Sequence, residues 1–493
     1  MSCRKLSRII RTNKNKRRRE QAAKRTNKEH LAASLTWLLS DDSIFSQMRL
    51  HGNTKWLPRC LVCLAMFWAW SEAKHLTDAF TQAAECCQSL FQTAILGTYQ
   101  GFMGALTRWT PTLMTILWSL LHERMREIGG KFWRIHGWVP IAFDGSRAAA
   151  PRTEVNERAF CAPNYGKGKT AKYRKKKSKG MRRKNNEKNK SQPQEPQAWI
   201  TLLWHMGLRL PWTWLLGPSN SSERAHVMEM IRPRKFPKNT LFCGDAGFVG
   251  FPLWSHIVQS SGQFLVRVGA NVSLLRESAD YELAENGLVL CWPQAMQGTQ
   301  PPLRLRLVKV RIGKTAMYLL TSVLDSKKLT IPQMVTFYKM RWGIEVEFRG
   351  LKQTLDRAKL RCRNDQRLLA ELDWSIMAMA VAELFALKEQ LAKEPRVRGQ
   401  ACLTADPTRR SLANTMRAIR GCIRAPDAIP RAGAELATLL RKAVTDGYHR
   451  KKPKRARYRP PNPDKKPLGA PNVRKITAKE KKQLREIQKE LAV

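Results

Sequence analysis

The sequence has few acidic residues for its size. Its 493 residues include 89 Lys and Arg but only 39 Asp and Glu, so the formal net charge is +50. A chain this basic is expected to meet a polyanion, and nucleic acid is the first choice. A ribosomal, nucleoid or RNA-binding protein fits the charge equally well. Charge therefore indicates a class of partner and not an activity.

Long apolar runs are also absent. The most apolar stretch, residues 57–70, contains Arg59 and is shorter than the ~18 residues that a membrane span needs. The first residues are rich in Arg and Lys and lack the apolar core of a secretory signal. We therefore expect no membrane partner, and a cytosolic protein whose 11 cysteines are reduced. Cys60 and Cys63 have no second pair at zinc spacing.

Composition changes along the chain predict its domain limits, and the length allows several domains. Residues 1–28 are expected to be a basic disordered arm. Residues 29–135 have apolar side chains at helical spacing and predict a helical N-terminal domain. Residues 136–395 combine strand and helix patterns in one domain, residues 396–449 predict further helices, and residues 450–493 form a basic tail.

The segment YKMRWGIEVEFRGLK, residues 338–352, has helical periodicity. Tyr338, Arg341, Glu345 and Lys352 fall on one narrow stripe of the helix. Glu345 can ligate a hard cation, while Arg341 and Lys352 can hold phosphate oxygens. The alternative is a solvated helix face with an ion pair between Arg341 and Glu345. The apolar residues around this segment share the neighbouring, core-facing side of the helix: Phe337, Ile344, Phe348, Leu351 and Leu355.

The spacing Tyr-x2-Arg-x3-Glu-x6-Lys, with Trp342 after the arginine, resembles the YREK signature of the insertion sequence 4 family of DDE transposases. The resemblance implies two aspartates upstream at strand ends. The chain has Asp144 in the apolar run WVPIAFDGSR and Asp245 in NTLFCGD, each beside a glycine. Asp325 also ends an apolar run, but it lies too close before the signature to be the second aspartate of the family.

Strands around these aspartates come first as a meander and then alternate with helices. This order fits an α/β fold with a ribonuclease H-like mixed sheet. Residues 165–190 are nearly all Lys, Arg, Gly, Ser and Asn, so a loop is expected that either follows DNA phosphates or only raises solubility. The resemblance implies a β-strand insertion at residues 270–324. Trp292 in this insertion would stack on a base flipped out of the transposon end, or would belong to a hairpin core.

The resemblance also implies the chemistry of the site. Asp144, Asp245 and Glu345 would be the catalytic residues and would hold two Mg²⁺ ions, with Mn²⁺ as a possible substitute. The other signature residues, Tyr338, Arg341 and Lys352, would bind DNA phosphates. The implied reaction is DNA cleavage and strand transfer at terminal inverted repeats, which is cut-and-paste transposition of an insertion sequence.

The implied partners are double-stranded DNA, as transposon ends and as target, and a second copy of the chain in a homodimer on DNA. The helical N-terminal domain would take part in recognising the transposon end, or would be a cap without a DNA role. The implied location is the bacterial cytoplasm, at the nucleoid. Two other functions remain open: a noncatalytic nucleic-acid-binding protein from a decayed or domesticated element, and a ribonuclease H-like nuclease without strand transfer.

Overall fold

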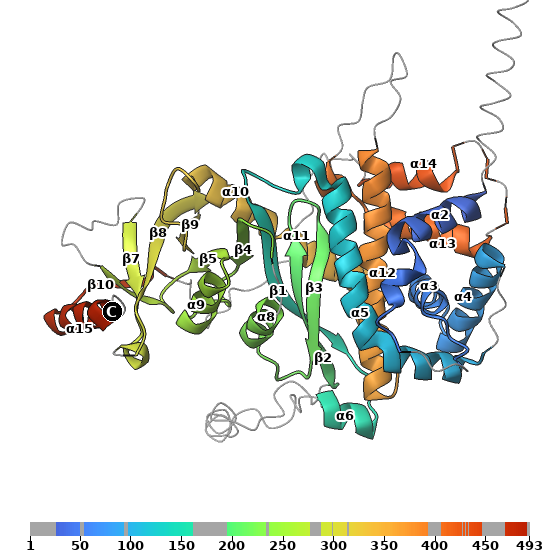
Figure 1. The fold of residues 1–493 in the computed structure, drawn as a ribbon, viewed down its shortest axis with the longest axis horizontal. Helices are drawn as coiled ribbons and strands as arrows, with labels where there is room; N and C mark the ends of the chain where they lie inside the picture. The colour runs from blue at the N-terminus through green and yellow to red at the C-terminus, as the bar shows by residue number, and fades with distance from the viewer. Residues whose placement is uncertain are drawn as a thin grey trace, which may run out of the picture. The chain divides into compact units, whose positions relative to one another are not determined.

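The chain divides into two compact units, whose helices and strands are labelled in Figure 1. Unit 1 comprises Met1–Gly129, Arg147–Ala198 and Arg349–Thr445, and unit 2 comprises Gly130–Ser146, Trp199–Phe348 and Asp446–Val493. The computed structural model describes residues 26–49, 54–92, 97–160, 195–232, 236–276, 287–297, 299–312, 315–392, 406–425, 427–428, 430–431, 433–445 and 469–490. Most of the predicted basic arm, all of the loop 165–190 and residues 450–468 of the predicted tail lie outside these ranges.

Unit 1 is built from helices. They are α2 (Asn27–Leu39), α3 (Pro58–Trp70), α4 (Leu76–Phe91), α5 (Tyr99–Gly129), α6 (Glu154–Phe160), α12 (Asp365–Leu391), α13 (Leu412–Arg424) and α14 (Leu436–Arg441), with the short 3₁₀ helices η1 (Asp42–Phe45) and η4 (Pro407–Arg409). α12 packs against α3, α5, α13 and α14, and its side chains from Ser375 to Leu387 are all buried. The predicted helical N-terminal region is confirmed. No helix in the described ranges is long and apolar enough to cross a bilayer.

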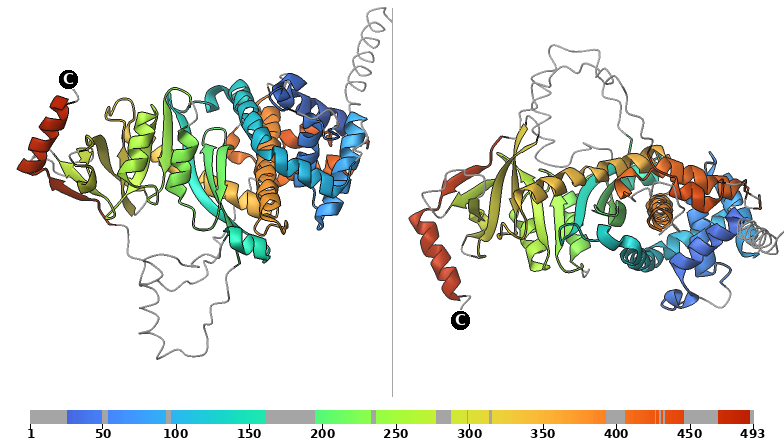
Figure 2. Two further views of the ribbon diagram at one scale, coloured as in Figure 1. Left: turned by 60° about the horizontal axis from the view of Figure 1, so that its bottom comes forward. Right: turned by 90° about the horizontal axis from the view of Figure 1, so that it is seen from above.

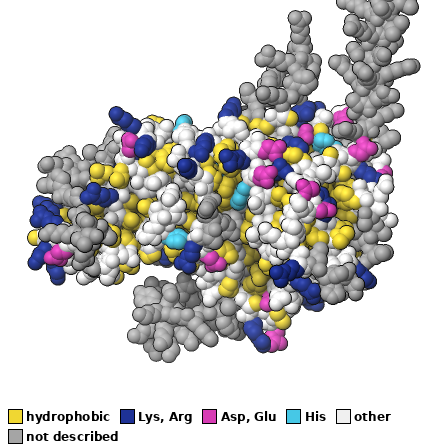
Figure 3. Space-filling view, viewed as in Figure 1, with side chains coloured by type: hydrophobic (Ala, Val, Ile, Leu, Met, Phe, Trp, Pro, Cys, Tyr) yellow, Lys and Arg dark blue, Asp and Glu magenta, His cyan; other side chains and the backbone are white. Residues whose placement is uncertain are grey.

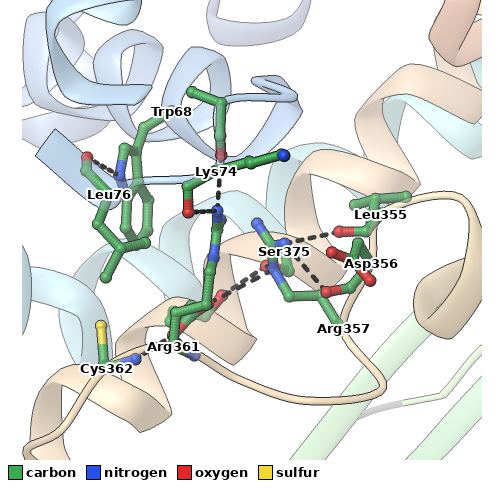
Figure 4. Close-up of polar contacts among 11 residues, drawn as sticks. Trp68, Lys74, Leu76, Leu355, Asp356, Arg357, Arg361, Cys362 and Ser375 are labelled. Carbon is green, nitrogen blue, oxygen red and sulfur yellow. Dashed lines mark hydrogen bonds and ion pairs between the residues drawn. The ribbon is translucent and has the colours of Figure 1, made fainter. Parts of the chain in front are cut away.

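A buried arginine in unit 1 holds the turn that follows the signature segment (Figure 4). Arg357 donates from Nη1 to the carbonyl of Leu355 (2.6 Å) and from Nε to Oγ of Ser375 (2.8 Å). Oε1 of Glu371 lies 3.7 Å from Nε of Arg357 and 3.5 Å from Nε of Arg361. Burial lowers the pKa of Arg357 to about 10. These contacts tie the turn to α12, which carries Ser375 and Glu371.

The sheet of unit 2 has ten strands in the order β10-β6-β7-β8-β9-β5-β4-β1-β2-β3. The end of β1 and the start of β2 belong to unit 1. The strands are β1 (Val139–Ala149), β2 (Gln197–His205), β3 (Leu210–Gly217), β4 (Thr240–Gly244), β5 (Gln263–Val268), β6 (Ser273–Arg276), β7 (Gly287–Cys291), β8 (Leu303–Ile312), β9 (Thr315–Thr321) and β10 (Asn472–Lys475).

One half of this sheet is a meander followed by parallel strands. β2 and β3 are antiparallel, whereas β1, β4 and β5 are parallel neighbours. The helices α8 (Glu223–Ile231) and α9 (Phe251–Gln259) connect β3, β4 and β5. Seen from above, α10 (Ile331–Arg341) lies on the opposite face of the sheet from α8 and α9 (Figure 2). The predicted α/β fold with a ribonuclease H-like mixed sheet is confirmed.

The other half of the sheet is the predicted β-strand insertion. β6, β7, β8 and β9 pair antiparallel in succession, and β9 pairs antiparallel with β5. The short 3₁₀ helix η3 (Gln294–Met296) follows β7. The insertion therefore extends the main sheet edge to edge, because each strand offers its free backbone groups to the next one.

Two predicted boundaries were wrong. The first strand was expected to end at Asp144, but β1 continues to Ala149, where the Ala149 N–H donates to the carbonyl of Ala358 (2.9 Å). The signature segment was expected to be one helix, but α10 ends at Arg341 and α11 (Gly343–Gln353) begins after Trp342. In both cases the boundary depends on a distant part of the chain that the local pattern does not contain.

Candidate active site

The three predicted carboxylates lie on three neighbouring elements of unit 2. β1 and β4 are parallel, and Ala142 is opposite Cys243 in their register. Asp144 and Asp245 each come two residues later, so the register brings them level. Glu345 stands in the first turn of α11. The sequence patterns therefore identified acidic residues that the fold brings to one edge of the sheet.

Each aspartate accepts a hydrogen bond from a backbone N–H one or two residues later in the chain. Oδ1 of Asp144 accepts from the N–H of Gly145 (2.8 Å), and Oδ1 of Asp245 accepts from the N–H of Gly247 (2.7 Å). A further acidic residue was missed by the sequence analysis: the carboxylate of Glu223 packs so close to Gly145 that a Cβ there would collide with it. Glu223 opens α8, and an acid in a first helical turn gives no signal of a site because it is a common feature of helices.

Arg341 lies between two of the carboxylates. Its Nη1 is 3.5 Å from Oδ2 of Asp144, and its Nη2 is 3.5 Å from Oε1 of Glu345. Its guanidinium also lies over the rings of Tyr338 (5.7 Å) and Trp342 (5.8 Å). The side chain is 4% exposed, and Nε has no hydrogen-bond partner among the described residues. A buried cation with an unused donor thus occupies the centre of the site.

The pKa of Asp144 is shifted by its burial and by the charged groups around it. Burial raises its pKa to about 6, and the nearby charges of Asp245 and Glu345 act in the same direction. The Gly145 N–H and the guanidinium of Arg341 oppose the rise by stabilising the carboxylate. A buried carboxyl group whose pKa is raised to about 6 beside other acids is typical of functional sites.

The carboxylates fit a hard divalent cation in their chemistry, since Mg²⁺ prefers carboxylate oxygens. As the described side chains stand, no three His, Cys, Asp or Glu residues form a ready metal site. Arg341 supplies the positive charge between Asp144 and Glu345 in this arrangement. The three carboxylates are therefore suitable ligands for Mg²⁺. In the observed side-chain positions, the charge of Arg341 partly neutralises Asp144 and Glu345.

The remaining signature residues are placed by the two helices. The ring of Tyr338 is buried at 5% exposure, one turn before Arg341. Lys352 stands on α11, which continues into unit 1, and burial lowers its pKa from the ordinary lysine value. The neighbouring apolar side is buried as predicted: Phe337, Ile344, Phe348, Leu351 and Leu355.

α10 and α11 meet where β2 approaches them. Thr330 caps α10 and forms a capping box with Gln333. A Cβ at Gly343 would collide with the ring of Trp204, which is fully buried on β2. Glycine at this position therefore lets the helix pack directly on the indole, and it places Glu345 two residues after the junction.

Among the described residues, no contact links Trp292 to the carboxylates. Its ring is 4% exposed within a cluster that contains Leu275, Leu290, Ile476 and Ile487, and its Nε1 donates to the carbonyl of Gln300 (2.8 Å). Base stacking by Trp292 stays a prediction, and it requires these neighbours to uncover the ring. By contrast, Trp342 is 58% exposed directly beside Arg341.

Part of the chain is similar to known transposases. Residues 141–381 match the transposase DDE domain. The matched range includes all three carboxylates and both signature helices. Among solved structures, the cryo-EM structure of the piggyBac transposase synaptic complex with hairpin DNA is similar, with 12% identity over 84% of this chain and 85% of that chain and a TM-score of 0.35. No curated protein matches.

Proposed function

We propose that the protein is a DDE transposase that cleaves DNA at terminal inverted repeats and transfers the cleaved strand, in cut-and-paste transposition of an insertion sequence. The observation that carries the proposal is that Asp144 on β1, Asp245 after β4 and Glu345 on α11 lie close enough for the latter two to raise the pKa of Asp144, with Arg341 between Asp144 and Glu345. The match of residues 141–381 to the transposase DDE domain supports it. The signature spacing supports membership of the insertion sequence 4 family.

Asp144, Asp245 and Glu345 would hold Mg²⁺, or Mn²⁺ as a substitute. The chemistry that such ions would supply is activation of a water or a 3′-hydroxyl and stabilisation of the leaving oxygen. Arg341 is suited to a phosphate because its planar fork pairs with two oxygens. The phenol of Tyr338 and the ammonium of Lys352 would add contacts to the phosphates of the cleaved end.

The DNA partner follows from charge. The chain has a net charge of +50, and Lys and Arg side chains are spread over the face shown in Figure 3. Phosphate neutralisation by such residues supplies most non-specific affinity for DNA. The substrates would be the two inverted-repeat ends and a target duplex, held by a homodimer in the bacterial cytoplasm at the nucleoid.

The test is cleavage of a DNA fragment that carries the flanking inverted repeat, with Mg²⁺. Glu345→Ala should abolish cleavage because it removes a cation ligand, and it should leave DNA binding nearly intact because the basic surface remains. Asp325→Ala is the matched control, since Asp325 is an exposed aspartate of unit 2 whose side chain accepts from the N–H of Lys327 within its own turn. The control should cleave like the wild type.

Cutting by Glu345→Ala at the wild-type rate would refute the assignment of this glutamate. Joining of the cleaved 3′ end to a target plasmid separates a transposase from a nuclease that only hydrolyses DNA. Binding without cutting by both the wild type and the control would refute the proposed chemistry and favour the noncatalytic alternative.

A further inference from the structure

The described part of the C-terminal tail docks on the β insertion of unit 2. β10 pairs in parallel with β6, from Asn472 opposite Ser273 to Lys475 opposite Arg276. α15 (Ala478–Glu490) follows directly. Ile476 and Ile487 from this segment pack in the cluster around Trp292. The β10–α15 segment, residues 472–490, is therefore anchored both by backbone pairing and by apolar burial.

One acidic residue fixes the geometry inside this segment. Glu480 accepts hydrogen bonds from Arg474 (2.9 and 2.6 Å), from the N–H of Thr477 (2.9 Å) and from Nε2 of Gln297 (3.0 Å). These bonds, that of Arg474 above all, lower the pKa of Glu480 to about 2. Glu480 is also buried. Its charge is thus used within the fold and does not offset the cations on the outer side.

The outer side of the segment is basic. On α15 the buried or half-buried side chains share one face, which includes Glu480 and Ile487, and the cations occupy the opposite face. Figure 3 shows Lys and Arg side chains gathered at this end of unit 2. Within the described residues no ion pair joins these cations to a carboxylate, and the one exposed acid on this side of α15 is Glu486. The exposed members of this cationic face are Lys475, Lys479, Lys481, Lys482 and Arg485.

We infer that the cationic face of the β10–α15 segment is a docking surface for the phosphate backbone of duplex DNA. The inference rests on the proposed function, in which DNA is the substrate. Lys479 and Arg485 are about 9 Å apart along the helix at a rise of ~1.5 Å per residue, a length in which one strand carries two or three charges when measured along the duplex axis at ~3.4 Å each. The face exposes no large apolar side chain, so it lacks what an interfacial membrane helix inserts into lipid.

The experiment measures the dissociation constant for a duplex over a salt series, without divalent cations. The test variant is the triple substitution Lys479→Gln, Lys482→Gln and Arg485→Gln. The control triple removes the same charge from exposed cations elsewhere in unit 2, outside the proposed DNA-recognition domain: Lys238→Gln, Lys327→Gln and Lys328→Gln. Each contacted phosphate contributes ~0.9 to the slope of log K against log salt. We expect the test triple to lower this slope by about 2–3 and to weaken binding at least tenfold near 0.1 M salt, while the control keeps the wild-type slope.

Equal losses in both triples would show a general charge effect and would overturn the inference, as would an unchanged slope in the test triple. A misfolded β10–α15 segment would also weaken DNA binding. A second triple variant therefore keeps a positive charge at each of the three positions: Lys479→Arg, Lys482→Arg and Arg485→Lys. This variant should retain the wild-type slope, and its failure to do so would refute a phosphate contact. DNA binding without divalent cations is measured independently of cleavage. If the wild type did not cleave DNA, the proposed function would be refuted, but the measured DNA contact of the β10–α15 segment would still hold.

Discussion

Replacing Asp144 with asparagine should stabilise the protein at neutral pH. Burial raises the pKa of this carboxyl from 3.8 to about 6. At a pH below 3.8, the carboxyl is protonated in both the folded and the unfolded chain, so it does not change the free energy of unfolding. Between the two values the unfolded chain releases its proton first, and stability falls as the pH rises. Above the folded pKa the full penalty persists, so the wild type carries it at neutral pH.

The size of the penalty follows from the shift. One pKa unit corresponds to ~1.4 kcal/mol, so a shift of roughly two units corresponds to about 3 kcal/mol. The side chain of Asp144 is 19% exposed, which keeps solvent screening small. Asparagine retains an acceptor for the Gly145 N–H but loses the charge that pairs with Arg341. We therefore expect a net gain of about 1–3 kcal/mol, which raises Tm by about 2–12 °C in a unit of this size.

The assay is calorimetry of wild type and Asp144→Asn from about pH 4.5 to pH 8 without divalent cations, a range that brackets the two pKa values. The Tm advantage of the variant should be small at the acidic end and should reach its full value above neutrality. Asp325→Asn, in an exposed turn of the same unit, controls for the lost charge and should show no such rise. An advantage that is the same at every pH, or a variant less stable than wild type above neutrality, would refute the reasoning.

Three further substitutions test the packing described above, each by thermal or urea unfolding. Gly343→Ala should destabilise by about 1–3 kcal/mol because its methyl group meets the ring of Trp204, and a neutral result would show that the helix junction can move freely. Arg357→Met should cost about 2 kcal/mol or more because it removes a partner of buried Glu371, and wild-type stability would contradict that pairing. Thr330→Ala should cost about 1 kcal/mol through the lost capping box. Thr330→Ser should keep most of the wild-type stability because serine retains the capping hydroxyl.

Much of the fold was accessible from the sequence because it depends on short patterns. The N-cap of α8 is Ser222, and serine is a residue type that favours this position. The buried side of the signature helices followed from helical spacing, and the strand before Asp245 followed from an apolar run that ends in glycine. Each of these features is decided within a few residues, so no knowledge of the fold was needed.

The rest depends on contacts between distant residues. The break at Trp342 arises where Gly343 meets Trp204 of β2, more than a hundred positions earlier in the sequence. The position of Arg341 between Asp144 and Glu345 requires the register of the sheet and the packing of α10. The pairing of β10 with β6 joins the tail to the insertion. The sequence of neither strand indicates which strand it pairs with.

The central claim is that Asp144, Asp245 and Glu345 hold a divalent cation together. The most direct measurement replaces Mg²⁺ with Fe²⁺ in the presence of DNA, generates hydroxyl radicals at the bound iron with ascorbate and peroxide, and maps the cut protein chain by mass spectrometry. The account predicts cuts close to all three residues, suppressed by excess Mg²⁺ and lost in Glu345→Ala. Cuts confined to other parts of the chain, or cuts at the three residues that persist in Glu345→Ala, would contradict it.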